Sequence, residues 1–123
     1  MTKLIGTAIL AALTIFGALA QAPNVTGTWT ASFDTQVGKQ EYTYTFKVEG
    51  GTLTGTAKGN LITDSTLSDA KIDGNKITFV EKGSYMGMPL EFNYSGEVAG
   101  NELRLKRELM GFPAEEFVAK RSQ

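Results

Sequence analysis

The chain has 123 residues, and its 12 Lys and Arg residues nearly balance its 13 Asp and Glu residues, so the net charge at pH 7 is −1. Such a balance argues against nucleic acid or an anionic membrane surface as a partner, because both bind basic patches. The chain contains no His and no Cys, which excludes a Ser-His-Asp triad, a cysteine nucleophile, an ordinary zinc site and disulfide bonds.

The first 20 residues have the pattern of a cleaved signal peptide. Lys3 supplies a positive start, an apolar segment runs from Leu4 to Phe16, and Ala18 to Ala20 form a small-x-small cleavage site. The apolar segment is too short and too often interrupted for a membrane span. We therefore expect a secreted or periplasmic protein with no membrane span. The predicted organisation is a signal peptide over residues 1–20, a short leader over 21–26 and a single β-barrel domain over 27–123.

Eight later segments alternate polar and apolar residues with the period of a half-buried β-strand. They span residues 27–34, 41–48, 52–58, 67–73, 76–82, 90–98, 102–109 and 116–121. The clearest is 41–48, where Tyr42, Tyr44 and Phe46 alternate with polar residues. No stretch of ten residues after the signal peptide shows the 3.6-residue period of a helix, so we expect an all-β domain.

The predicted connections alternate between short glycine turns and longer loops. The short turns span residues 49–51, 73–75 and 99–101, and the longer loops span 35–40, 59–65, 83–88 and 110–115. Successive turns of an up-and-down arrangement lie at opposite ends. The predicted fold class is therefore an all-β, eight-stranded antiparallel up-and-down barrel with a narrow end and a looped mouth, closed so that no edge strand is exposed. The interior of such a barrel is either filled by side chains or holds one small ligand.

Residues at both ends of the domain resemble the calycins, the superfamily that includes lipocalins and avidins. Gly27-Thr28-Trp29 is similar to the Gly-x-Trp that begins their first strand, and Arg121 is similar to the arginine of their last strand that lies over this indole. The segment from Gly51 to Ala57 also resembles the third strand of avidins. The resemblance implies a barrel closed by Trp29 and Arg121, but not biotin binding, because Ala31 stands where avidins carry Asn. The chain is also similar to small secreted bacterial proteins of uncharacterised function.

Strand direction predicts which inward side chains surround a cavity below the mouth. Two of them, Glu81 and Arg107, are charged, and burying a charge is costly unless it is paired or hydrated. They either form a salt bridge that plugs the barrel, or Arg107 receives a ligand carboxylate or sulfate that Glu81 positions; a register error that puts one of them outside is the third possibility. The interior tyrosines either bond to one another in a packed core or stack on a sugar or aromatic ligand. The predicted ligand-binding residues are Phe33, Tyr42, Tyr44, Phe79, Glu81, Phe92, Tyr94 and Arg107.

Two predicted mouth loops share the pattern Met-Gly-apolar-Pro, over residues 86–89 and 110–113. Exposed Met and Phe are unusual in loops, and adaptable Met side chains often line permissive binding surfaces. These loops either fold inward over the core, form a portal for a ligand, or dock a protein. The predicted mouth residues are Tyr85, Met86, Met88, Met110 and Phe112.

We expect a monomeric barrel that binds a small apolar or amphipathic molecule through its mouth, with no metal or cofactor. The alternative is a non-catalytic module that recognises carbohydrate or protein through its Met-rich rim. A two-carboxylate glycosidase is the least favoured, because Glu91 and Glu108 point outward and Glu81 lacks a second inward acid. A buried cavity would favour ligand binding inside the barrel, whereas a filled barrel with exposed Met and Phe side chains at the mouth would favour the interaction module.

Overall fold

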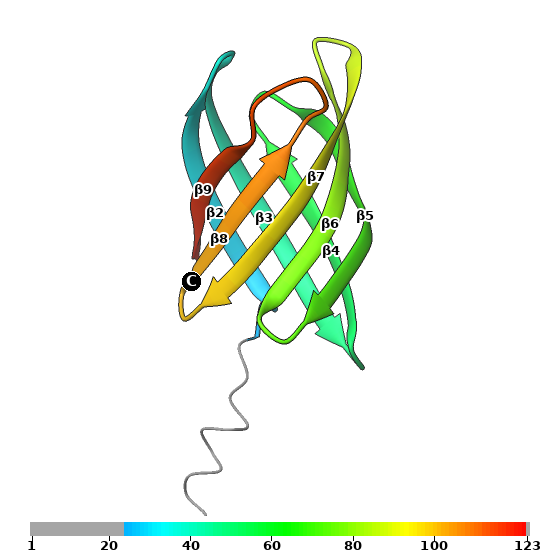
Figure 1. The fold of residues 1–123 in the computed structure, drawn as a ribbon, viewed down its shortest axis with the longest axis vertical. Coiled ribbons are helices and arrows are strands. Elements are labelled where there is room, and N and C mark those ends of the chain that lie inside the picture. The colour runs from blue at the N-terminus through cyan, green and yellow to red at the C-terminus, as the bar shows by residue number, and fades with distance from the viewer. Residues whose placement is uncertain (1–23, 123) are drawn as a thin grey trace, which may run out of the picture.

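The computed structural model describes residues 24–122, and the predicted signal peptide and positions 21–23 of the predicted leader lie outside this range. Within it, eight antiparallel strands follow one another around a nearly closed barrel (Figure 1). The strands are β2 (Gly27–Thr35), β3 (Gly38–Glu49), β4 (Thr52–Gly59), β5 (Thr63–Asp73), β6 (Lys76–Tyr85), β7 (Met88–Ala99), β8 (Glu102–Glu108) and β9 (Glu115–Arg121). The predicted all-β meander of eight strands is confirmed.

The first and last strands of the barrel pair with each other. The hydrogen-bonded order is β4-β3-β2-β9-β8-β7-β6-β5. β2 and β9 pair over a short stretch, Trp29 with Arg121 and Thr30 with Lys120. β4 and β5 are the two ends of this order, and they lie side by side without belonging to one ladder. The seam between β4 and β5 is the reason that the barrel is nearly, rather than fully, closed.

The narrow end carries the three glycine turns predicted from the sequence. β3 is joined to β4 by Gly50 and Gly51, whose φ angles of 58° and 82° lie in the left-handed region. Two-residue turns also join β5 to β6 and β7 to β8. The last described residues lie at this end as well (Figure 1).

The mouth differs from the prediction, because two of its four expected long loops are two-residue turns. Residues 36–37 join β2 to β3, and Met86 and Gly87 join β6 to β7. The φ angles of Met86 and Gly87 are 49° and 83°, as in the type I′ turns that suit the twist of a hairpin. The predicted loops at 35–40 and 83–88 are therefore wrong.

For the connection between β2 and β3, the reason lies in the inner row of β3. β3 begins at Gly38, three residues earlier than predicted, and its inner row continues through Gln40, which is 3% exposed. A buried polar side chain breaks the apolar alternation from which strands are recognised. Longer connections remain between β4 and β5, at residues 60–62, and between β8 and β9, at 109–114.

Inward-facing side chains fill the barrel. The rings of Tyr42 and Tyr44 stack with centroids 5.1 Å apart, and those of Phe79 and Tyr94 stack at 4.4 Å. Gly55 makes room for this core, because a Cβ atom there would lie 2.7 Å from the ring of Phe46. The most completely buried large side chains are Trp29, Arg107, Tyr44, Phe46, Phe79, Ile77, Leu103, Glu81 and Val25.

Candidate functional site

At the narrow end, Arg121 of β9 lies over the indole ring of Trp29 of β2, with 4.3 Å between the guanidinium carbon and the ring centroid. Arg121 also donates to the backbone carbonyls of Asn24 and Thr26, at 2.9 Å each. The indole N–H of Trp29 donates to the carbonyl of Val25, also at 2.9 Å. Residues 24–26 are thereby held against the barrel, and the two residues that the resemblance pairs lie in contact.

Glu81 of β6 has no exposed surface, and its carboxylate accepts three hydrogen bonds from hydroxyl groups. Tyr94 donates to Oε1 at 2.7 Å, while Tyr42, at 2.9 Å, and Ser65 donate to Oε2. The hydroxyl groups of Tyr44 and Tyr94 lie 2.9 Å apart. Because Tyr94 gives its one proton to Glu81, Tyr44 must be the donor in that pair.

Arg107 of β8 is 1% exposed and is held by a ring of polar partners. Its Nε donates to Glu115 at 2.6 Å. Its Nη1 donates to the hydroxyl groups of Tyr42 and Tyr94, at 3.2 and 3.3 Å, and its Nη2 donates to Gln40 at 3.0 Å. Four of the five guanidinium N–H groups thus have partners, which is the condition for burying such a charge.

Aromatic rings enclose the same guanidinium group. Its carbon lies 4.2 Å from the ring centroid of Phe92, 5.0 Å from Phe33, 5.4 Å from Tyr42 and 5.9 Å from Phe117. Phe33 and Phe117 also stack on each other, at 3.8 Å. Cations are attracted to ring faces within about 6 Å, so these rings offset part of the hydration that Arg107 loses.

Glu81 and Arg107 both point inward, which excludes a register error. They do not form a direct salt bridge: within residues 24–122, the ion pair of Arg107 is with Glu115. The hydroxyl groups of Tyr42 and Tyr94 lie between the two buried charges and bond to both. We call this set, completed by Tyr44, Ser65, Gln40 and Glu115, the interior network.

The eight predicted interior residues all lie on the inner face and are brought together. Five of them, the three tyrosines, Glu81 and Arg107, are joined by hydrogen bonds, and the three phenylalanines pack around them. Three network members are not among the predicted residues: Gln40, Ser65 and Glu115. Gln40 and Glu115 could have been found, because each precedes an inner aromatic residue by two positions, the period of one strand face.

Burial raises the pKa of all three interior tyrosines above the ordinary value of 10.0. For Tyr42, the negative charge of Glu81 adds to the effect of burial, and the positive charge of Arg107 opposes it. For Tyr44, the hydrogen bond with Tyr94 opposes burial. These hydroxyl groups therefore stay protonated at neutral pH. A protonated hydroxyl group can donate to one partner and accept from another.

At the mouth, five large apolar side chains are exposed, and we call them the rim. Their exposed fractions are 47% for Val37, 85% for Met86, 60% for Met88, 94% for Met110 and 57% for Phe112. Met88 begins β7, and the others lie on connections that project from the same end of the barrel (Figure 1). These side chains do not cap the core. Tyr85, the remaining predicted mouth residue, is half-buried and packs against the core.

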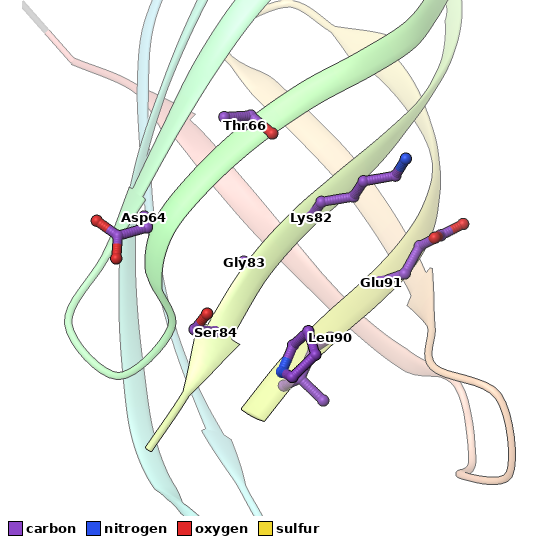
Figure 2. Close-up of a pocket in the computed structure, with 8 residues that line it drawn as sticks. Asp64, Thr66, Lys82, Gly83, Ser84, Leu90 and Glu91 are labelled. Atoms are coloured by element: carbon purple, nitrogen blue, oxygen red, sulfur yellow. The ribbon is translucent and has the colours of Figure 1, made fainter. Parts of the chain in front are cut away.

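A shallow groove lies on the outer surface of β5, β6 and β7 (Figure 2). Lys82 and Glu91, which face each other across β6 and β7, both line it. Its other lining residues are Asp64, Thr66, Gly83, Ser84, Pro89 and Leu90. None of the eight predicted ligand-binding residues borders this groove, so it is separate from the interior network.

Comparison with models of protein families, with curated proteins and with solved structures found no match to this chain. The comparisons thus identify no family; the structure itself shows a nearly closed eight-stranded antiparallel barrel in which Arg121 lies over Trp29. Within residues 24–122, no helix has the length and apolar character needed to cross a membrane. In the same range, no three Asp or Glu side chains gather as a group that could hold a metal ion.

Proposed function

We propose that the protein is a non-catalytic interaction module that binds a protein partner through the rim. One observation carries this proposal: the barrel exposes five large apolar side chains at its mouth while its interior is filled. Several large apolar side chains exposed at the same end of a molecule leave apolar surface that a partner can cover, as at interaction sites.

The filled interior favours the rim over the barrel cavity as the place of binding. Glu81 and Tyr44 have no exposed surface, so no water-sized space lies beside them. A small ligand at the depth expected from the sequence would have to displace the interior network. Leaving one charge of a buried pair without its partner costs about 3–5 kcal/mol, which an apolar ligand would have to offset.

The composition of the mouth resembles the centre of a protein interface. Its four connections, at residues 36–37, 60–62, 86–87 and 109–114, contain no charged residue. Charged side chains begin on the flanking strands, at Asp34, Lys39, Asp64, Glu108 and Glu115. An apolar centre with a polar border is the usual anatomy of such interfaces, and Met is enriched in them.

A protein with an apolar cleft suits the rim better than a carbohydrate does. Met86 and Met110 are the most exposed rim residues, and full burial of one such side chain contributes about 1.5–3 kcal/mol. Sugar recognition instead needs flat rings with nearby hydrogen-bonding groups, and Phe112 is the one aromatic ring of the rim. Because the predicted signal peptide directs export, the protein would bind its partner in the periplasm or outside the cell.

Photocrosslinking in the protein's own host tests the proposal. The photoreactive residue p-benzoylphenylalanine would replace Met86, Met110 or, as a control, Val118, an apolar residue on the outer face of β9 that is 40% exposed. We expect one adduct of defined mass from the two rim positions and none from position 118. Equal adducts from position 118, or none from the rim, would refute a rim interface. An adduct of twice the chain mass would instead identify self-association and contradict a separate partner.

A further inference from the structure

Glu81 and Glu115, the two acidic residues that offset the positive charge of Arg107, are held in different ways. Glu81 has no exposed surface and accepts three hydroxyl bonds, so it is locked into the core. Glu115 has a side chain that is 33% exposed, and its carboxylate contacts Arg107 Nε at 2.6 Å. One acid is therefore fixed, and the other stands between Arg107 and solvent.

The position of Glu115 in the chain would allow another anion to replace its carboxylate beside Arg107. It is the first residue of β9, directly follows the longest connection of the mouth, and faces Arg107 across the β8–β9 ladder. The stacked rings of Phe33 and Phe117 lie beside the guanidinium group. Phe117 is buried, whereas Phe33 is half-buried. An anion that took the place of the Glu115 carboxylate would therefore meet a buried cation with the partly exposed ring of Phe33 beside it.

We propose that Glu115 occupies an anion site on Arg107 that an external carboxylate or sulfonate can take when it is attached to a flat apolar group. Glu115 is tethered, and a tethered group competes at an effective concentration of about millimolar or more. Simple inorganic anions therefore displace it poorly. An amphipathic anion gains further contact with the partly exposed ring of Phe33, and that contact selects it over simple anions. This site does not depend on the rim proposal.

Two related dyes test the site. 8-Anilinonaphthalene-1-sulfonate is a flat amphipathic anion, and N-phenyl-1-naphthylamine is its neutral counterpart. We expect Glu115→Ala to tighten binding of the sulfonate at least about 10-fold, since the tethered competitor is gone, and to leave binding of the neutral dye unchanged. Glu116→Ala is the matched control, because it removes the same charge one residue away on the outer face.

The near-ultraviolet circular dichroism of Trp29 shows whether each variant folds. If Glu115→Ala does not fold, Glu115→Gln takes its place in the experiment. It removes the charge but still fills the site, so a smaller gain for the sulfonate, of about 3-fold, is expected. Equal gains for both dyes would show loosened structure rather than an anion site. A gain with Glu116→Ala as large as with Glu115→Ala, or no gain with either Glu115 variant, would overturn the proposal.

Discussion

Glu81 and Arg107 are both buried, and they are joined through the hydroxyl groups of Tyr42 and Tyr94 rather than by a direct contact. Each bridging hydroxyl donates to the carboxylate and accepts from the guanidinium group. The two charges are thus neutralised across a shell of hydrogen bonds that holds β3, β6, β7 and β8 together. Such a network is stabilising only while every member keeps its partners.

Removing the hydroxyl group of Tyr94 should weaken the barrel more than removing that of Tyr85. The Tyr94 hydroxyl bonds to Glu81, Tyr44 and Arg107. We expect Tyr94→Phe to lower the free energy of unfolding by about 2–4 kcal/mol, because bonds to charged groups are lost and buried partners are left unsatisfied. Tyr85 lies at the mouth outside the network, and Tyr85→Phe should change stability by less than about 0.5 kcal/mol. Urea unfolding of both variants checks this, and equal effects would contradict the network's role.

The two buried charges should be energetically coupled although they do not touch. Glu81→Leu alone leaves Arg107 undercompensated and should cost about 3–5 kcal/mol, and Arg107→Leu should cost a similar amount. The double variant should cost less than the sum by about 1–3 kcal/mol, because no single charge is then stranded. A double-mutant cycle from urea unfolding measures this coupling. Strict additivity would mean that the hydroxyl bridge does not link the charges.

Stability should fall steeply at alkaline pH. The pKa of each interior tyrosine is raised by burial, so below about pH 10 both the folded and the unfolded chain keep these protons. Above pH 10 the unfolded chain releases them and the folded chain does not, so the stability contribution is lost as pH rises. The expected slope is about 1.4 kcal/mol per pH unit for each tyrosine, or about 4 kcal/mol for the three.

Tyrosinate absorbance and far-ultraviolet circular dichroism, recorded in one alkaline titration, check this dependence. Most of the tyrosinate signal should appear together with the loss of strand signal, since three of the four tyrosines belong to the network. Complete ionisation in a chain that still shows its strand signal would contradict the burial of these hydroxyl groups.

At the narrow end, Trp29 should contribute more to stability than Arg121. Trp29→Ala removes a fully buried indole and should cost about 3–5 kcal/mol, as for other large core truncations. Arg121→Ala removes a partly exposed cation over that ring and should cost about 1–2 kcal/mol. Thermal or urea unfolding of the two variants gives the comparison. A near-neutral Trp29→Ala would mean that this contact does not close the barrel.

The strands, their order and the apolar inner rows could be predicted because alternation of apolar and polar residues is strong over most of the barrel. The prediction failed toward the mouth, where the inner rows become polar at Gln40 and Glu115 and lose their contrast with the outer rows. It also missed Ser65, for a different reason. β5 has register shifts between Thr63 and Thr66 and between Ser68 and Lys71, so its side chains do not keep a simple two-residue period.

The turn at residues 86–87 was predicted as a longer loop for another reason. Met86 takes a left-handed φ of 49° in a turn where Asn, Asp or Gly is the usual signal. A hairpin turn formed by Met-Gly therefore lacks the usual sequence signal, and the sequence predicts a loop there instead. The same residue is one of the most exposed in the rim, so an unusual turn presents an apolar side chain at the surface proposed for binding.

The most direct test of rim binding is photocrosslinking from position 37 in a chain that also carries Met86→Ser, Met110→Ser and Phe112→Ser. These side chains are exposed, so the variant should fold with the stability of the wild type. We predict that the adduct formed from position 37 in the otherwise unaltered chain disappears in this variant, while a Val118→Ser control retains it. An undiminished adduct from the folded triple variant would contradict binding through the rim.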